Sequence, residues 1–156
     1  MSGQRPGIAL VGLMALGLAA CAKSASLDLG AFERRASDGT LALYWSCKPE
    51  GRDLLLIDGA VDNPYQPLPI RDVEVSAFGV NAQGQEVSRA TGPAADYQIP
   101  PMVPSPFRIE LRLTGGERQI DLRYQYRGAG GGGRSMDARP AVVSNMIRDA
   151  CSRVRG

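Results

Sequence analysis

The sequence predicts an all-β protein, built as an antiparallel β-sandwich of about six or seven short strands. Apolar and polar residues alternate with a period of two in several short runs, which is typical of strands with one buried face. The 19 Gly and 11 Pro supply many turns between such strands. With 156 residues, 44% of them hydrophobic and 22% charged, the chain suits a single globular domain.

Residues 1–20 have the order of an export signal. Arg5 lies in a short polar start, residues 8–18 are apolar, and small residues follow. No acidic residue occurs before Asp28, and the apolar stretch is too short to cross a hydrocarbon core of about 30 Å comfortably. We therefore expect a cleaved signal peptide instead of a membrane span.

The end of this segment, Leu18-Ala19-Ala20-Cys21, resembles the lipobox of bacterial lipoproteins. The resemblance implies cleavage before Cys21 and lipid on that cysteine, so that the membrane is a partner of the chain. Two or more acyl chains form a stable anchor, because each buried CH₂ contributes about 0.8 kcal/mol. Ala22, where many lipoproteins retained at the inner membrane have Asp, favours the outer membrane facing the periplasm. The alternative is an ordinary signal peptide with a chance cysteine.

Residues 21–39 are predicted to form a lipidated tether, because they are short, polar and mixed. A brief helical turn is expected near Leu29. The β-sandwich domain is predicted to cover residues 40–127, and its first strand to cover residues 40–47. The residues of this strand that face inward are Leu41, Leu43, Trp45 and Cys47.

The rest of the domain repeats the same alternation between turns. Further strands are expected at residues 53–62, 70–80, 86–90, 107–113 and 118–127. Gly84 suits a hairpin turn, since glycine readily takes a positive φ. The five prolines between residues 92 and 106 predict a connection between the sheets without regular pairing.

Residues 128–137 are rich in glycine and are predicted to be a flexible linker. Residues 138–156 are predicted to form a short C-terminal helix, with Pro140 in its first turn. Its apolar stripe at helical spacing consists of Val143, Met146, Ile147, Ala150, Cys151 and Val154. We expect this helix to dock on the sandwich.

Cys47 and Cys151 are predicted to form a disulfide. An exported chain folds in an oxidising compartment, where disulfides persist. With Cys21 lipidated, these two cysteines can pair only with each other. Such a bridge would hold the C-terminal segment on the sandwich across the glycine-rich linker. The alternative is a pair of buried thiols.

Four pieces of the middle of the chain occur in a recognisable order. They are Ile57-Asp-Gly-Ala-Val-Asp-Asn63, Ile70-Arg-Asp-Val-Glu-Val-Ser-Ala-Phe-Gly-Val80, the turn 81–87, and Pro104-Ser-Pro-Phe-Arg-Ile-Glu-Leu111. Together they resemble the FxLYD-type immunoglobulin-like domains of prokaryotic lipoproteins and exported proteins. Phe78-Gly-Val-Asn81 stands where that family has Phe-x-Leu-Tyr-Asp. The resemblance implies an immunoglobulin-like sandwich outside the cytoplasm, with no catalytic residues to transfer.

The composition argues against several classes of site. The chain has no histidine, which excludes Ser-His-Asp and Cys-His catalysis. A net charge of +2 is too small to indicate a nucleic-acid partner. The acids that could bind calcium and the methionines that could bind copper are spread over separate segments, so we expect neither a metal nor a cofactor. These residues are Asp58, Asp62 and Asp72, and Met102, Met136 and Met146.

Asp58 and Asp62, as a pair of carboxylates, could in principle cleave glycosides, but alternation places both on the outward, solvated face of their strand. Trp45, Tyr124 and Tyr126 are expected in the core, so they do not mark a recognition face.

The anchor and the lack of catalytic groups together predict a membrane-anchored envelope lipoprotein. Its sandwich is expected to bind or scaffold another envelope protein, for example by offering a sheet edge to an extended segment. The alternative is a carrier that holds a lipid or another small apolar molecule between its sheets, which requires an open cavity there. An enzyme ranks third, because no nucleophile, base and oxyanion donors occur together.

Overall fold

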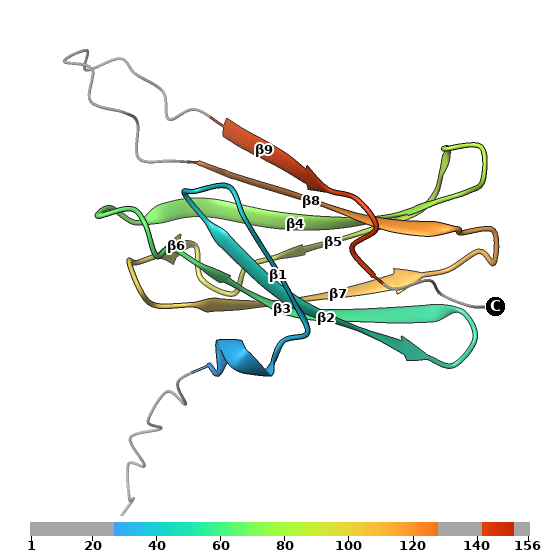
Figure 1. Cartoon of the computed structure of the whole chain (residues 1–156), viewed down its shortest axis with the longest axis horizontal. Coiled ribbons are helices and arrows are strands. Elements are labelled where there is room, and N and C mark those ends of the chain that lie inside the picture. Colours follow the sequence, from blue (N-terminus) through green and yellow to red (C-terminus); the bar gives the residue numbers. More distant parts are fainter. Residues whose placement is uncertain (1–26, 128–141, 152–156) are drawn as a thin grey trace, which may run out of the picture.

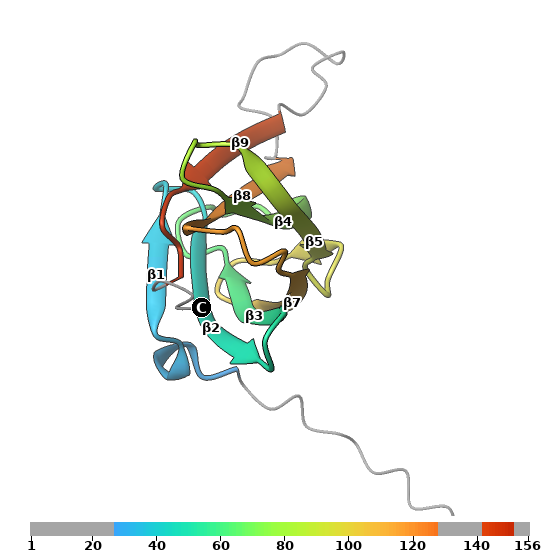
Figure 2. The same cartoon turned by 90° about the vertical axis from the view of Figure 1, so that its right-hand side faces the viewer.

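The computed structural model describes residues 27–127 and 142–151. Two antiparallel sheets face each other across an apolar core (Figures 1 and 2). The only helical element in these residues is a 3-10 turn, η1 (Leu29–Ala31), which begins after the capping side chain of Asp28. The all-β class predicted from the alternation is confirmed, and so is the brief turn near Leu29.

The first sheet has the strand order β1-β2-β3-β7. Its strands are β1 (Arg34–Ser37), β2 (Ala42–Glu50), β3 (Leu54–Asp62) and β7 (Ser105–Arg112). The second sheet has the order β5-β4-β8-β9, with β6 paired to β4. Its strands are β4 (Ile70–Val80), β5 (Glu86–Pro93), β6 (Gln98–Ile99), β8 (Gln119–Arg127) and β9 (Val142–Ile147).

The core consists of the inward-facing residues of both sheets. The alternation along β7 is the simplest case, because every second residue from Ser105 to Leu111 is buried and the others are exposed. Trp45, Tyr124 and Tyr126 are all buried, as the alternation predicted. The ring of Phe107 lies over Gly59, at a position where any side chain would collide with it. Close packing of inward-facing side chains from both sheets forms one apolar cluster between them.

The predicted C-terminal helix is wrong: residues 142–147 form strand β9. This strand pairs antiparallel with β8, from Leu122 opposite Ile147 to Arg127 opposite Val142. Val143, Asn145 and Ile147 are partly buried, while the residues between them are exposed. A helix would have left the backbone groups along this side of β8 without partners, whereas a ninth strand satisfies them.

Other boundaries also differ from the sequence predictions. β1 lies within residues 21–39, which were expected to be tether, so the folded domain begins before residue 40. β2 continues past Cys47 to Glu50, and the turn that follows is centred on Gly51, with a φ of 70°. Asp62 is buried, not outward. The predicted signal peptide (1–20), the first residues of the tether and the glycine-rich linker (128–137) lie outside the described residues.

Candidate functional site: the edge strand β9 and its surroundings

The outer edge of β9 is open. β9 is the last strand of its sheet, and within the described residues no strand pairs with its other side. Its sequence, Val-Val-Ser-Asn-Met-Ile, contains neither a charged residue nor a proline. Val142 is 62% exposed and Met146 is 47% exposed. Natural proteins usually protect a sheet edge with charges, proline or a cover, and β9 has none of the first two.

The other sheet edges are protected or closed. β1 is only four residues long and begins with two arginines. On the opposite side of the sandwich, the edges of β5 and β7 lie against each other, and Ala95 N donates a 2.8 Å hydrogen bond to the carbonyl of Pro106. Gly92 packs so closely on the backbone of Arg108 that a side chain there would collide with it. β9 is therefore the longest unprotected edge in the described part of the chain.

A concave surface of about 360 Å³ adjoins β9 on the outward face of its sheet. Met146 and Arg148 form its margin at the edge, and Phe78 lies on β4 farther in. The guanidinium groups of Arg89 and Arg123 lie 4.6 and 4.8 Å from the centre of the Phe78 ring. Cation-π contacts of this kind favour fixed arginine positions. Glu86 and Asp121 also line the surface, so it carries charges of both signs, and Met146 is its exposed large apolar side chain.

The inward side of β9 is held by a polar cluster at the turn between β1 and β2. Asn145 Nδ2 donates a 2.7 Å hydrogen bond to Asp38 Oδ2, and the Tyr126 hydroxyl donates to the same oxygen at 3.1 Å. Burial raises the pKa of Asp38, but hydrogen bonds from the backbone of Leu41 and Thr40 outweigh it, so that the pKa lies below its ordinary value. Burial and the nearby Asp38 carboxylate raise the pKa of Tyr124. Asp38 is thus ionised near neutral pH and fixes β9 through Asn145.

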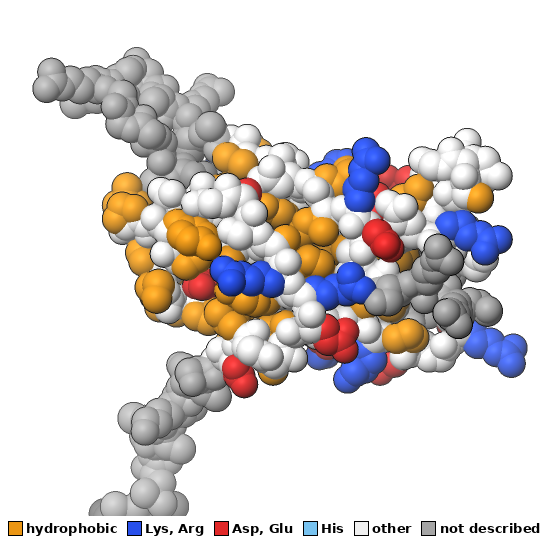
Figure 3. All heavy atoms as spheres, viewed as in Figure 1, with side chains coloured by type: hydrophobic (Ala, Val, Ile, Leu, Met, Phe, Trp, Pro, Cys, Tyr) orange, Lys and Arg blue, Asp and Glu red, His pale blue; other side chains and the backbone are white. Residues whose placement is uncertain are grey.

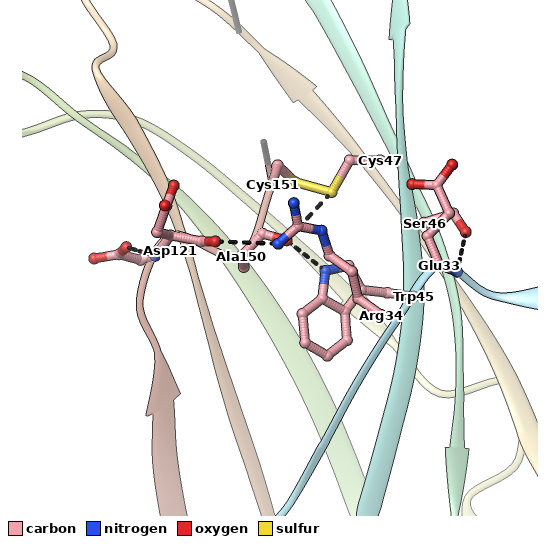
Figure 4. Close-up of a disulfide and its surroundings, with 9 residues drawn as sticks. Glu33, Arg34, Trp45, Ser46, Cys47, Asp121, Ala150 and Cys151 are labelled. Atoms are coloured by element: carbon pink, nitrogen blue, oxygen red, sulfur yellow. Dashed lines mark hydrogen bonds between the residues drawn. A yellow bond between two sulfur atoms is a disulfide. The ribbon is translucent and has the colours of Figure 1, made fainter. Parts of the chain in front are cut away.

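The end of β9 is attached to the first sheet by a disulfide between Cys47 and Cys151, whose Cα atoms are 5.7 Å apart (Figure 4). Beside it, Trp45 Nε1 donates a 2.7 Å hydrogen bond to the carbonyl of Ala150. Ala150 N donates to the carbonyl of Ile120 at 2.7 Å. The predicted disulfide is therefore present, but it follows a strand in place of the expected helix.

Asp149 lies in the turn between β9 and the disulfide, with a positive φ of 51°. Its backbone N–H donates a 2.9 Å hydrogen bond to Asp121 Oδ1, which also accepts from the Gln119 amide at 2.6 Å. Its carbonyl accepts from Arg34 at 3.4 Å. These contacts hold a conformation that L-residues rarely adopt, and so fix the direction in which the chain leaves β9.

No family model and no curated protein sequence matches the chain. Among solved structures, it is similar to a DUF4466 family protein from Parabacteroides merdae, with 8% sequence identity and a TM-score of 0.33. The match covers 69% of this chain and 43% of that one. Function is therefore inferred from the geometry of this chain itself.

The structure separates the other residues that the sequence singled out. Asp58 pairs with Arg108 at 2.6 Å, Asp72 pairs with Arg127 at 3.3 Å, and Asp62 is buried in β3. Residues 27–127 and 142–151 contain no group of three acids or cysteines placed to hold a metal ion. In the same residues, no helix is long and apolar enough to cross a membrane. Cys21, the predicted lipidation site, and Met136 lie outside them.

Sequence reasoning missed the open edge of β9, since it assigned these residues to a helix. One signal was present: Val142 and Val143 are adjacent β-branched residues, which favour a strand.

Proposed function

We propose that the protein is an exported lipoprotein, held at a membrane by lipid on Cys21, whose non-catalytic β-sandwich binds an extended segment of another envelope protein along β9. The observation that carries this proposal is the edge of β9, which has no charge and no proline and pairs with no strand among residues 27–127 and 142–151. A segment added there gains main-chain hydrogen bonds to β9. The resemblance of residues 18–21 to a lipobox supports export and membrane anchoring. The expected location is the outer membrane, facing the periplasm.

Specificity would come from the face of the sheet. In an added strand, every second side chain projects to the same side as Val142 and Met146. Those side chains would lie beside the concave surface that Phe78, Arg123 and Arg148 help to line. Because Glu86 and Asp121 lie there as well, a partner segment with apolar residues at alternate positions, one of them against Met146, fits this surface best.

The strand order supports an immunoglobulin-like architecture, and the sequence resemblance is the basis for proposing the FxLYD type. β2, β3 and β7 take the places of strands A, B and E of one immunoglobulin sheet, while β4, β8 and β9 take those of C, F and G in the other. β5 lies beside β4 as strand C′ does in variable-type domains. On this assignment the proposed binding edge belongs to strand G.

A carrier function for a small apolar molecule has less support. Such a ligand would need space between the sheets, where the structure has a continuous cluster of buried residues. The large side chains in its centre include Leu41, Ile57, Leu111 and Leu122. The edge of β9 therefore gives the protein-binding role the stronger basis.

Site-specific photocrosslinking tests the binding mode. A photoreactive amino acid is placed at Val142, Ser144 or Met146 in the full chain in cells, with Ala82, in the exposed turn between β4 and β5, as the control. We expect the three β9 positions to crosslink one partner at points spaced two residues apart within one segment, and Ala82 to give no such product. Crosslinks scattered over unrelated proteins would refute an added strand.

The anchor has a separate test. Mass spectrometry of the mature chain should find an acylated Cys21 as its first residue, and Cys21→Ser should move the protein from the membrane fraction to the soluble fraction. An unmodified Cys21 in membrane-bound protein would contradict the anchor without affecting the argument for β9.

A further inference from the structure

One end of the sandwich is apolar. Among the described residues, seven large hydrophobic side chains are exposed, and five of them lie in two connections at this end. Residues 63–69 link β3 to β4, and residues 97–104 lead through β6 to β7. The five are Tyr65 (50% exposed), Leu68 (55%), Tyr97 (65%), Met102 (73%) and Val103 (53%). In Figure 3 apolar side chains gather at the left, over these connections.

Residues 63–69 and 97–104 contain no charged residue, and Asp96 directly precedes the second stretch. The turns at the opposite end differ sharply, since they include Arg52 and Asp53 between β2 and β3, and Glu117 and Arg118 between β7 and β8. In Figure 3 the right-hand end accordingly shows several basic side chains. The sandwich therefore exposes most of its large apolar side chains at one end and has two charged turns at the other, an arrangement that suits contact with hydrocarbon at the first end.

The apolar end is rigid. Asn63 is fully buried and its side-chain amide donates to the carbonyls of Leu68 and Ile99, at 2.9 and 3.3 Å, so that it joins the two connections. The carbonyl of Asn63 accepts from Met102 N at 3.2 Å. Met102 has a φ of 61°, a strained conformation for methionine, and yet its side chain is the most exposed of the five. Prolines limit the remaining backbone freedom.

The start of the folded domain lies in the half of the molecule that carries these connections (Figure 1). Arg35 of β1 donates a 3.3 Å hydrogen bond to the Tyr65 hydroxyl, which links the N-terminal strand to the first connection. From Cys21 to Leu27 the chain advances by six residues. Even a fully extended chain of that length spans at most about 22 Å, so a lipid on Cys21 would keep this half of the domain near the membrane surface.

We propose that the connections 63–69 and 97–104 enter the interfacial layer of the membrane and form a second contact besides the lipid. Tyrosines suit this layer, where the ring meets hydrocarbon and the hydroxyl meets water. Tyr65, Leu68, Tyr97, Met102 and Val103 project from fixed loops, so that insertion orders little additional chain. The contact would orient the sandwich with its polar end outward. This inference rests on the proposed anchoring at Cys21.

The test uses the mature chain coupled to vesicles through Cys21. The other two cysteines form the disulfide, so a maleimide-bearing lipid reacts with the Cys21 thiol alone. The variants Leu68→Trp and Tyr97→Trp each place an indole at the apolar end, and Gln83→Trp places one in the exposed turn between β4 and β5 at the other end. Trp45, the single native tryptophan, is buried and gives the same background in all three.

In vesicles of phosphatidylethanolamine and phosphatidylglycerol with bromine-labelled acyl chains, the indoles at positions 68 and 97 should be quenched several-fold more than the one at position 83. Quenching should be strongest with bromine near the headgroup end of the chain, at an insertion depth of about 5–10 Å. Equal quenching at all three positions, or none, would overturn the membrane contact. In this test the chain is coupled to lipid chemically, so the result does not depend on acylation in cells. If Cys21 is not acylated in cells, only the mass spectrometry described above would detect it.

Discussion

Trp45 Nε1 donates a hydrogen bond to the carbonyl of Ala150, a residue 105 positions later in the chain, across 2.7 Å (Figure 4). Trp45 is 3% exposed and Ala150 is 1% exposed, so the bond is shielded from water. It lies next to the disulfide and joins the same two segments. A non-covalent contact and a covalent one thus fix the end of β9 together.

Removal of the indole N–H should weaken this attachment. Trp45→Phe keeps an aromatic ring but leaves the buried carbonyl of Ala150 without its donor, which costs about 1–3 kcal/mol. We expect the free energy of unfolding to fall by at least that amount, since the smaller ring also leaves space in the core, and urea denaturation with circular dichroism measures the change. Tyr44→Phe is the matched control, since Tyr44 is only partly buried and keeps its ring beside Arg35; its effect should stay within about 0.5 kcal/mol. Equal stability of Trp45→Phe and the native chain would disprove the role of the bond.

Loss of the disulfide should cost more. The bridge closes a loop with a sequence separation of 104 residues. A disulfide that closes a loop of this size restricts the unfolded chain strongly, and its removal typically lowers the free energy of unfolding by about 2–5 kcal/mol. The double variant Cys47→Ser, Cys151→Ser should therefore unfold at a much lower urea concentration. The native chain in reductant should match it, and a native chain insensitive to reductant would contradict the prediction.

Glu117 should make stability depend on acid. Burial raises the pKa of its carboxyl, but hydrogen bonds, including those from the Thr114 backbone and hydroxyl, outweigh this and lower it from 4.5 to about 2. A depressed pKa contributes stability that is complete above the unfolded value and is lost as pH falls through the folded value. Unfolding measurements should thus show a decline between about pH 4.5 and pH 2.

Two variants separate this effect from general acid denaturation. Glu117→Gln should flatten the decline, because the amide does not titrate. Thr114→Val removes one of the donors, the hydroxyl at 3.0 Å, and should give an intermediate slope. If Glu117→Gln has the same acid profile as the native chain, the carboxyl is not the cause.

Charges on the edge of β9 should block a partner without harming the fold. Val142→Lys and Met146→Lys together place two cations along the open edge, where exposure keeps the change in unfolding free energy within about 0.5 kcal/mol each. Photocrosslinking from position 144 should then be lost. The pair Ala82→Lys and Gln83→Lys adds the same charge in the exposed turn between β4 and β5 and should leave crosslinking intact. Crosslinking that survives the β9 lysines would exclude this edge.

The sequence was informative where one physical constraint acted alone. β7 separates two environments, core and solvent, and its alternation from Ser105 to Arg112 can be read directly. The disulfide followed from export and from the small number of cysteines, not from any estimate of distance. Both predictions depended on local pattern or on counting, and the structure agrees with both.

The candidate site could not be predicted because tertiary pairing determines it. Val143, Ile147 and Ala150 have helical spacing, and the inward position between the first two holds Asn145, which obscures the alternation of a strand. Asn145 lies on the inward side in register with β8, where Asp38, 107 positions earlier, accepts its hydrogen bond. Likewise, the polar residues Arg34 and Arg35 made the segment of β1 look like tether, although it pairs with β2. In both cases the deciding partner is distant in sequence, so no local window contains it.

The disulfide also determines how the domain would carry mechanical load. Consider a tethered molecule whose partner is paired with β9 and is pulled away from the membrane. A force that acts at Ile147, the last residue of β9, enters the chain four residues before Cys151. The force then crosses the covalent bond to Cys47 and leaves through β2 and β1 toward the N-terminus. Strands β3 to β8 lie within the closed loop and outside this path. Strands β3 to β8 would therefore stay unstretched while the bridge and β2 bear the tension.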